Sequence, residues 1–135
     1  MPFMAWNDKL SVGVKVIDDD HKTLLGLANE LYDAIGENRG KEVLGAILDR
    51  LVNYTRFHFG REEKFFAQTD YPDAARHKQE HDELVKQVLS IQERWNTGSH
   101  ALTLETMTFF KDWLFDHILG SDARYMPHLN GSGIR

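Results

Sequence analysis

The sequence predicts an all-α protein, an antiparallel up-down-up-down four-helix bundle with an extended N-terminal arm and a short C-terminal tail. Three observations lead to this fold class. Apolar residues recur with helical spacing in four stretches, turn-forming residues separate those stretches, and no two neighbouring segments predict a pair of strands. The 135 residues, of which 41% are hydrophobic, suffice for one compact domain with a substantial core.

The elements follow in order along this single predicted domain, residues 1–135. An arm of about 1–17 lacks helical periodicity, and Asp18, Asp19 and Asp20 can then cap the first helix, which ends near Gly36. The remaining helices are predicted over about 41–67, 72–96 and 101–119, so that the bundle covers about 18–122. The tail, about 123–135, contains one proline and two glycines and is expected to be irregular.

Composition excludes several classes of function. The net charge of -5 argues against nucleic acid and anionic membrane surfaces as partners. The absence of cysteine removes disulfides and thiolate metal sites. The N-terminus lacks the pattern of a signal peptide, and no apolar run reaches the roughly 20 residues of a transmembrane helix. We therefore expect a cytoplasmic protein, and a monomer.

Five histidines and two carboxylates fall near helix ends that an alternating bundle brings together. The first helix starts, the second ends, the third starts and the fourth ends at one end of such a bundle. The residues are His21, His58, Glu62, His77, His81, His117 and Asp122. Imidazole suits iron, zinc, copper and nickel, and carboxylates can bridge two cations. Spacing and topology therefore predict a metal site at that end.

The number of these residues indicates two metal ions, since one ion cannot use seven side chains. If Glu62 and Asp122 each bridge the two ions, together with one solvent oxygen, three histidines complete six ligands on one ion. The remaining two histidines give the other ion five ligands and leave one position open for a small molecule. Asp122 follows His117 by five residues, about 140° around an ideal helix. The helix must therefore deform or end near Gly120.

The ordered motifs resemble those of the hemerythrin family, and the resemblance extends from Trp6 to Tyr125. The motifs are DxxH at residues 18–21, HFxxEE at 58–63, HxxxH at 77–81 and HxxxxD at 117–122. The resemblance implies a non-haem di-iron centre with an oxo or hydroxo bridge. It further implies that His77, His81 and His117 bind the six-coordinate iron, that His21 and His58 bind the iron that takes up O2, and that Glu62 and Asp122 bridge.

The function expected from this resemblance is reversible O2 binding for storage or delivery, without an enzymatic reaction. Delivery would require an O2-consuming enzyme as a partner, which the sequence does not identify. The alternative is a sensor of O2, nitric oxide or redox state, or a peroxide scavenger, that uses the same di-iron site. Iron storage is disfavoured, because ligation by seven side chains opposes release of the metal.

Other interpretations of the histidines explain less. Residues 77–81 also match the inverted zinc-peptidase pattern HxxEH with Glu80 as the base, but this leaves four of the seven residues unused. Ferritin-like di-iron oxidases need Glu-x-x-His pairs, and the sequence contains none. His100 and His128 are expected to be ordinary surface residues. Glu80 is expected at the solvent or supporting a ligand.

Apolar residues close to the ligands in sequence can shape a pocket for O2. Leu114 lies about one turn before His117 and Leu25 about one turn after His21, with Phe59 and Trp113 nearby in sequence. An apolar wall would slow the access of protons and water to the metals. Ordinary core packing is the alternative for each of these residues.

Overall fold

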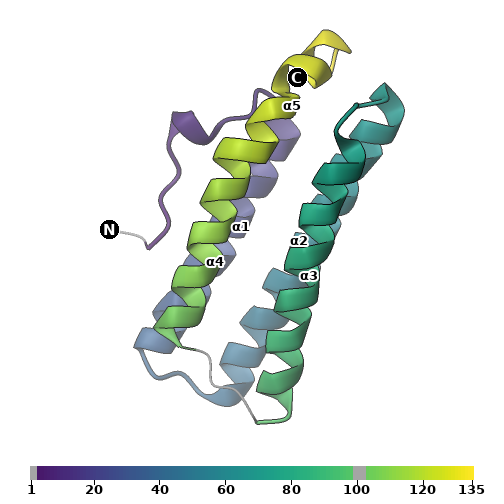
Figure 1. The fold of residues 1–135 in the computed structure, drawn as a ribbon. Helices are drawn as coiled ribbons and strands as arrows, with labels where there is room; N and C mark the ends of the chain where they lie inside the picture. The colour runs from purple at the N-terminus through teal and green to yellow at the C-terminus, as the bar shows by residue number, and fades with distance from the viewer. Residues whose placement is uncertain (1–2, 99–102) are drawn as a thin grey trace.

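The computed structural model describes residues 3–98 and 103–135, which form a bundle of antiparallel helices (Figure 1). The four long helices are α1 (Lys15–Gly36), α2 (Lys41–Thr69), α3 (Ala74–Asn96) and α4 (Leu104–Asp116). Each helix runs opposite to the one before it, and the residues that the structure describes contain no strand. The predicted antiparallel four-helix bundle is therefore confirmed. No helix within these residues is both long and apolar enough to cross a bilayer.

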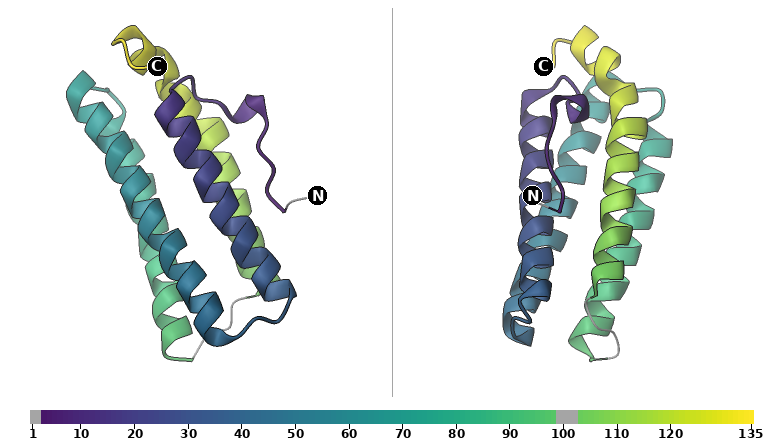
Figure 2. Two further views of the ribbon diagram at one scale, coloured as in Figure 1. Left: turned by 180° about the vertical axis from the view of Figure 1, so that it is seen from behind. Right: turned by 90° about the vertical axis from the view of Figure 1, so that its left-hand side faces the viewer.

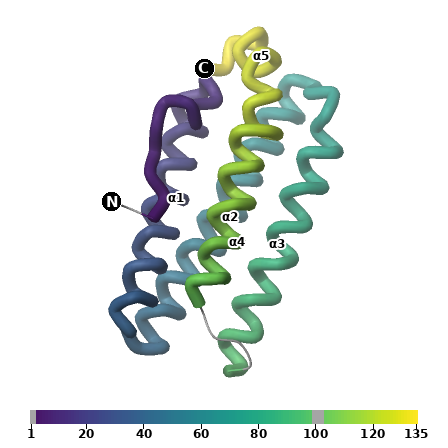
Figure 3. The backbone as a smooth tube through the Cα atoms, turned by 60° about the vertical axis from the view of Figure 1, so that its left-hand side comes forward, coloured from purple at the N-terminus to yellow at the C-terminus, as the bar shows by residue number. Residues whose placement is uncertain are grey.

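Two further helical segments follow α4 without a break. Residues His117–Asp122 form a π-helical turn, η2, and residues Ala123–Gly131 form α5. Figures 2 and 3 show α5 at the end of the bundle where α1 and α3 begin and α2 ends. This is the end at which the sequence predicts that the seven candidate ligands meet.

The start of α1 differs from the prediction. The helix begins at Lys15, so the aspartates 18–20 lie inside it and do not cap it. The helix begins earlier because Val14 and Ile17, three residues apart and both 0% exposed, already pack into the core. The expected starts of the third helix and of the fourth also shift, to Ala74 and Leu104. His100 and the predicted start of the fourth helix near residue 101 lie outside the described residues.

The N-terminal arm packs against the bundle. It is extended apart from a short 3₁₀ helix at Asp8–Leu10. The side chain of Asn29 on α1 accepts a hydrogen bond from the backbone N–H of Met4 at 2.7 Å and donates one to its carbonyl oxygen at 2.8 Å. Gly13, with φ of 71°, lies so close to α5 that a Cβ there would be 2.6 Å from the sulfur of Met126. Only glycine suits both the conformation and the contact.

The predicted irregular tail is wrong, because residues 123–131 form α5. Tyr125 and Leu129 lie four residues apart and are both 0% exposed, so one face of α5 closes the end of the bundle. His128, expected at the surface, is half-buried, and its Nε2 lies 2.8 Å from the carbonyl oxygen of Thr69 at the end of α2. α5 is thus attached to the bundle by both apolar and polar contacts.

Replacing Leu129 by alanine tests whether α5 unfolds together with the bundle. Truncating a fully buried leucine removes packing and leaves a cavity, so Leu129→Ala should lower the free energy of unfolding by about 2–5 kcal/mol. The control, Leu104→Ala, changes a leucine that is 50% exposed and should cost no more than about 0.5 kcal/mol. Urea unfolding of both variants measures the difference. An unchanged free energy in Leu129→Ala would show that α5 is not part of the cooperative unit.

Candidate metal centre

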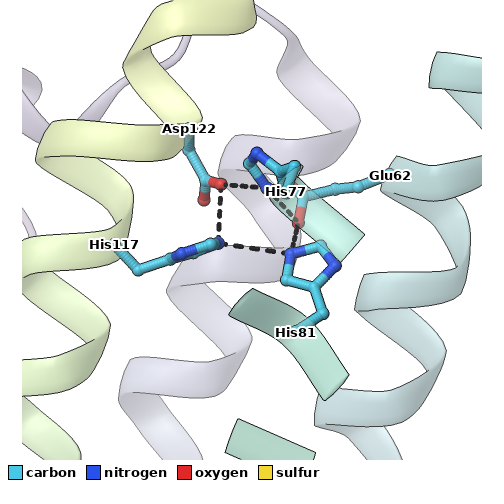
Figure 4. A group of neighbouring side chains, drawn as sticks. All are labelled: Glu62, His77, His81, His117 and Asp122. Carbon is cyan, nitrogen blue, oxygen red and sulfur yellow. Dashed lines mark hydrogen bonds and ion pairs between the residues drawn. The ribbon is translucent and has the colours of Figure 1, made fainter. Parts of the chain in front are cut away.

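The seven candidate ligands meet inside the end of the bundle that α5 covers. All seven are buried, and the most exposed of them, His117, is only 6% exposed. Their positions are His21 on α1, His58 and Glu62 on α2, His77 and His81 on α3, and His117 and Asp122 on η2. Figure 4 shows that five of them, from three helical segments, point toward one another. The convergence expected from helix order and spacing is therefore present.

Their ligand atoms form two overlapping groups, and within each group these atoms lie within 4.8 Å of one another. The larger group contains Glu62, His77, His81, His117 and Asp122. The smaller group contains His21, His58, Glu62 and Asp122. Only the two carboxylates belong to both groups. They lie between three histidines on one side and two on the other.

Asp122 directs its two carboxylate oxygens to different groups. Its Oδ1 lies 2.9 Å from Nε2 of His77 and 3.0 Å from Nε2 of His117. Its Oδ2 lies 3.1 Å from Nε2 of His21. A carboxylate in this orientation can offer one oxygen to each of two ions.

Glu62 uses only one of its two oxygens to approach histidines of both groups. Its Oε1 is 3.2 Å from Nε2 of His58 and also 3.2 Å from Nε2 of His81. Its Oε2 accepts a hydrogen bond from the hydroxyl of Tyr125 at 2.5 Å. Sequence analysis found no role for Tyr125, although its position three residues after Asp122 was a possible signal. The hydroxyl of this buried tyrosine therefore binds one oxygen of Glu62 and leaves Oε1 facing the histidines.

The π-helical turn η2 explains how His117 and Asp122 reach the same group. In an α-helix they would point about 140° apart. The π-helix pairs residues five apart, so these two side chains project from the same side of the turn. The sequence left open whether the helix deforms or ends near Gly120. It deforms and continues directly into α5.

Several buried polar atoms at this site have no hydrogen-bond partner within the residues that the structure describes. They are both ring nitrogens of His21, Nε2 of His77, Oε1 of Glu62 and Oδ1 of Asp122. Leaving such atoms unsatisfied costs about 1–3 kcal/mol each. They lie close together without hydrogen-bond geometry, as expected for atoms directed at a common centre. The nitrogen and oxygen donors fit a transition-metal ion.

The neighbouring carboxylates raise the pKa of His58 and of His117 above the usual histidine value when no metal is bound. Burial lowers the pKa of His58, but the carboxylates of Glu62, Asp20 and Asp122 outweigh it and raise that pKa to about 10. Burial conversely raises the pKa of Glu62 and of Asp122, but the neighbouring imidazoles hold both values below their usual range. His58 therefore favours its protonated form at neutral pH when no metal is bound.

Three further carboxylates lie beside the candidate ligands, and the sequence analysis did not assign two of them to the site. Asp20, Glu63 and Glu80 each lie 3.0–3.2 Å from Nδ1 of a candidate ligand histidine. The predicted role of Asp20 as a helix cap is wrong, since this residue is 3% exposed and faces His58. Glu80 contacts His117, which agrees with its expected supporting role and not with that of a peptidase base.

Aromatic rings cover the larger group of candidate ligands. Phe59 stacks on His81 with ring centroids 3.7 Å apart, and Trp113 stacks on His117 at 4.5 Å. These two aromatic residues therefore contact the site, as their sequence positions suggested. Leu25 and Leu114, the expected apolar wall, are 3% and 2% exposed.

Comparisons with known proteins agree with this arrangement. The family model described as "Hemerythrin HHE cation binding domain" matches residues 12–129. A bacteriohemerythrin of Methylococcus capsulatus is 34% identical over 131 residues, which cover 96% of this chain and 99% of that protein. A bacteriohemerythrin of Stenotrophomonas maltophilia is 33% identical over 134 residues, with 96% and 86% coverage.

A solved structure of wild-type hemerythrin superposes with a TM-score of 0.91 at 34% identity and covers 94% of this chain and 98% of its own. The helix order, the buried histidine and carboxylate cluster and these similarities agree with one another. This chain belongs to the hemerythrin family of cation-binding four-helix bundles.

Proposed function

We propose that the seven buried side chains bind two iron ions and that the protein reversibly binds O2 for storage or delivery. The observation that carries this proposal is the pair of overlapping groups with five and four members, which share only Glu62 and Asp122. Two ions that share both carboxylates use all seven residues. The similarity to bacteriohemerythrins supports iron as the metal.

The unequal groups provide a position for O2. Glu62, Asp122 and three histidines would hold one ion, and the same two carboxylates with two histidines would hold the other, leaving room there for a small ligand. The iron pair, when bound, supplies the redox chemistry by which O2 is taken up and released. The chain holds the imidazoles and carboxylates in place and restricts the access of water to them.

The test is an optical absorption spectrum of the reduced, iron-loaded protein during cycles between argon and air, with iron counted per chain. Two irons and a visible charge-transfer band that forms with O2 and disappears under argon are expected. Two irons with immediate and irreversible oxidation would replace the proposal with a redox sensor, a peroxide scavenger or an enzyme. A preference for zinc over iron would favour hydrolase chemistry instead.

The stability of the metal-free protein should fall as the pH rises from about 6.5 to about 10. The pKa of His58 is 6.5 without the protein environment and about 10 in the fold, so its protonated form stabilises the fold. This contribution is complete below pH 6.5 and is lost as the pH rises through 10. Metal replaces the protons in the loaded protein, whose stability should not show this decline.

Thermal unfolding of both forms across this range measures the difference. The midpoint of the metal-free protein should fall by about 3 °C or more relative to the loaded protein. Parallel curves for the two forms would show that His58 is not protonated inside the metal-free fold.

Leu114→Ala should accelerate autoxidation of the O2-bound form several-fold. Leu114 is 2% exposed and lies one turn before His117, so its truncation should open the interior near the site to water and protons. The decay of the charge-transfer band in air measures the rate. Leu119→Ala is the control, because Leu119 is 53% exposed. An equal rate in wild type and Leu114→Ala would remove Leu114 from the pocket wall.

A further inference from the structure

Three pairs of adjacent residues repeat one arrangement around the site. In each pair, one side chain is a candidate ligand and its neighbour in sequence is a carboxylate that contacts Nδ1 of a histidine on a later helical segment. The pairs are Asp20–His21 on α1, Glu62–Glu63 on α2 and Glu80–His81 on α3. Asp20 and Glu63 lie 3.0 Å from Nδ1 of His58 and of His81, at hydrogen-bond geometry. Oε2 of Glu80 lies 3.2 Å from Nδ1 of His117 as an ion-pair contact, without hydrogen-bond geometry.

We propose that Asp20, Glu63 and Glu80 are positioning residues that hold three ligand histidines of the metal centre in the orientation and tautomer that metal binding needs. The proposal rests on the metal centre proposed above. A carboxylate that accepts a hydrogen bond from Nδ1–H keeps the proton on that nitrogen, so that Nε2 is the nitrogen that gives up its proton when metal binds. In all three histidines Nε2 is the nitrogen that faces Glu62 or Asp122.

The three contacts also connect different helical segments of the bundle. Asp20 joins α1 to α2, Glu63 joins α2 to α3, and Glu80 joins α3 to η2. A displacement of one helix would therefore move a ligand on the next. His21 is outside this series, since its buried Nδ1 has no hydrogen-bond partner among the described residues.

Asp20 is the most firmly held of the three carboxylates. Its Oδ1 accepts a hydrogen bond from the hydroxyl of Tyr54 at 2.8 Å, and Nε of Arg61 lies 2.9 Å from its Oδ2. Tyr54 and Arg61 lie one turn before and one turn after His58 on α2, so Asp20 is held on both sides. The cation of Arg61 offsets the cost of burying this carboxylate. The Glu63 and Glu80 side chains, at 29% and 34% exposed, remain partly hydrated.

Neighbouring carboxylates provide matched controls with the same charge. Asp19 adjoins Asp20 but is 53% exposed in its side chain and pairs with Lys15 at 2.8 Å. Glu83 is exposed and lines the same surface hollow as Glu80 and His117. Neutralising either control removes a nearby negative charge without removing a described contact to a candidate ligand. The controls therefore distinguish a general effect of negative charge on cation binding from an effect of holding a ligand histidine in place.

The experiment titrates the metal-free full-length protein with Co²⁺ as the probe. The titration compares wild type with two test variants, Asp20→Asn and Glu80→Gln, and with two control variants, Asp19→Asn and Glu83→Gln. Wild type should bind two Co²⁺ ions, and the affinity for at least one of them should fall about 10–100-fold in Asp20→Asn and in Glu80→Gln. The Co²⁺ affinity of the two control variants should stay within about twofold of wild type, because a surface charge interacts only weakly with the buried site.

Proton NMR of the cobalt-loaded proteins supplies a readout that a loss of stability alone would not move. The exchangeable Nδ1–H signals of the ligand histidines are shifted by the paramagnetic ion. One such signal should move or broaden in Asp20→Asn, a different one in Glu80→Gln, and none in the controls. If Asp20→Asn fails to fold, as thermal unfolding of the metal-free variant would show, Glu63→Gln replaces it, because Glu63 is partly exposed.

The outcomes separate this proposal from the metal centre on which it rests. Two cobalt ions in wild type, with unchanged affinity and unchanged Nδ1–H signals in the variants, would overturn the positioning role alone. Equal losses of affinity in variants and controls would also overturn it, since charge would then explain the effect. A wild-type protein that binds no Co²⁺ would overturn both the positioning role and the two-metal centre.

Discussion

The burial of Glu62 and Asp122 inside an apolar bundle is the constraint on which the rest of the structure depends. Their side chains are 0% and 1% exposed, and an ionised carboxylate at that depth is costly unless opposite charges or metal ions surround it. Histidines from α1, α2, α3 and η2 meet this requirement together. Because each segment contributes at least one imidazole, the four ends must lie at the same level of the bundle. The alternating topology provides that alignment.

The same constraint explains the irregular end of α4. Asp122 reaches the cluster only because η2 widens the helix by one residue per turn, and this turn leads directly into α5. α5 then places Tyr125 against Glu62 and packs on the arm at Gly13. The position of Asp122 thus determines where α5 begins, and α5 in turn contacts the N-terminal arm. The fold of η2 and α5 at this end of the bundle therefore depends on the position of Asp122 in the buried cluster, and that position depends on the fold.

Much of the fold and of the candidate site could be predicted from the sequence, because both depend on periodicity and order. The spacing of His58 and Glu62, and of His77 and His81, places each pair on one helix face without any knowledge of packing. The five-residue step from His117 to Asp122 required a deformation that the structure contains. These inferences needed only the geometry of one helix at a time.

The missed features depend on contacts between elements. Asp20 resembled a cap because three aspartates preceded the helical pattern, and its inward direction follows from a helix that begins one turn earlier, at Lys15. α5 was missed because Pro127 and the nearby glycines outweighed the four-residue spacing of Tyr125 and Leu129. Whether such a short helix is stable depends on the bundle end that it covers, which local sequence does not describe.

A reversible O2 carrier and a protein that consumes O2 differ in more than their metal ligands. Both need a metal ion with an open position, so the ligand set alone does not separate them. The difference lies in how strictly the ligands are held and how well water is kept out. In this chain the three-histidine group carries two of the three supporting carboxylates and contacts with Phe59 and Trp113. In the two-histidine group, the buried Asp20 contacts His58 only, and Nδ1 of His21 has no hydrogen-bond partner among the described residues. The two groups therefore differ in how many of their histidines a neighbouring carboxylate holds.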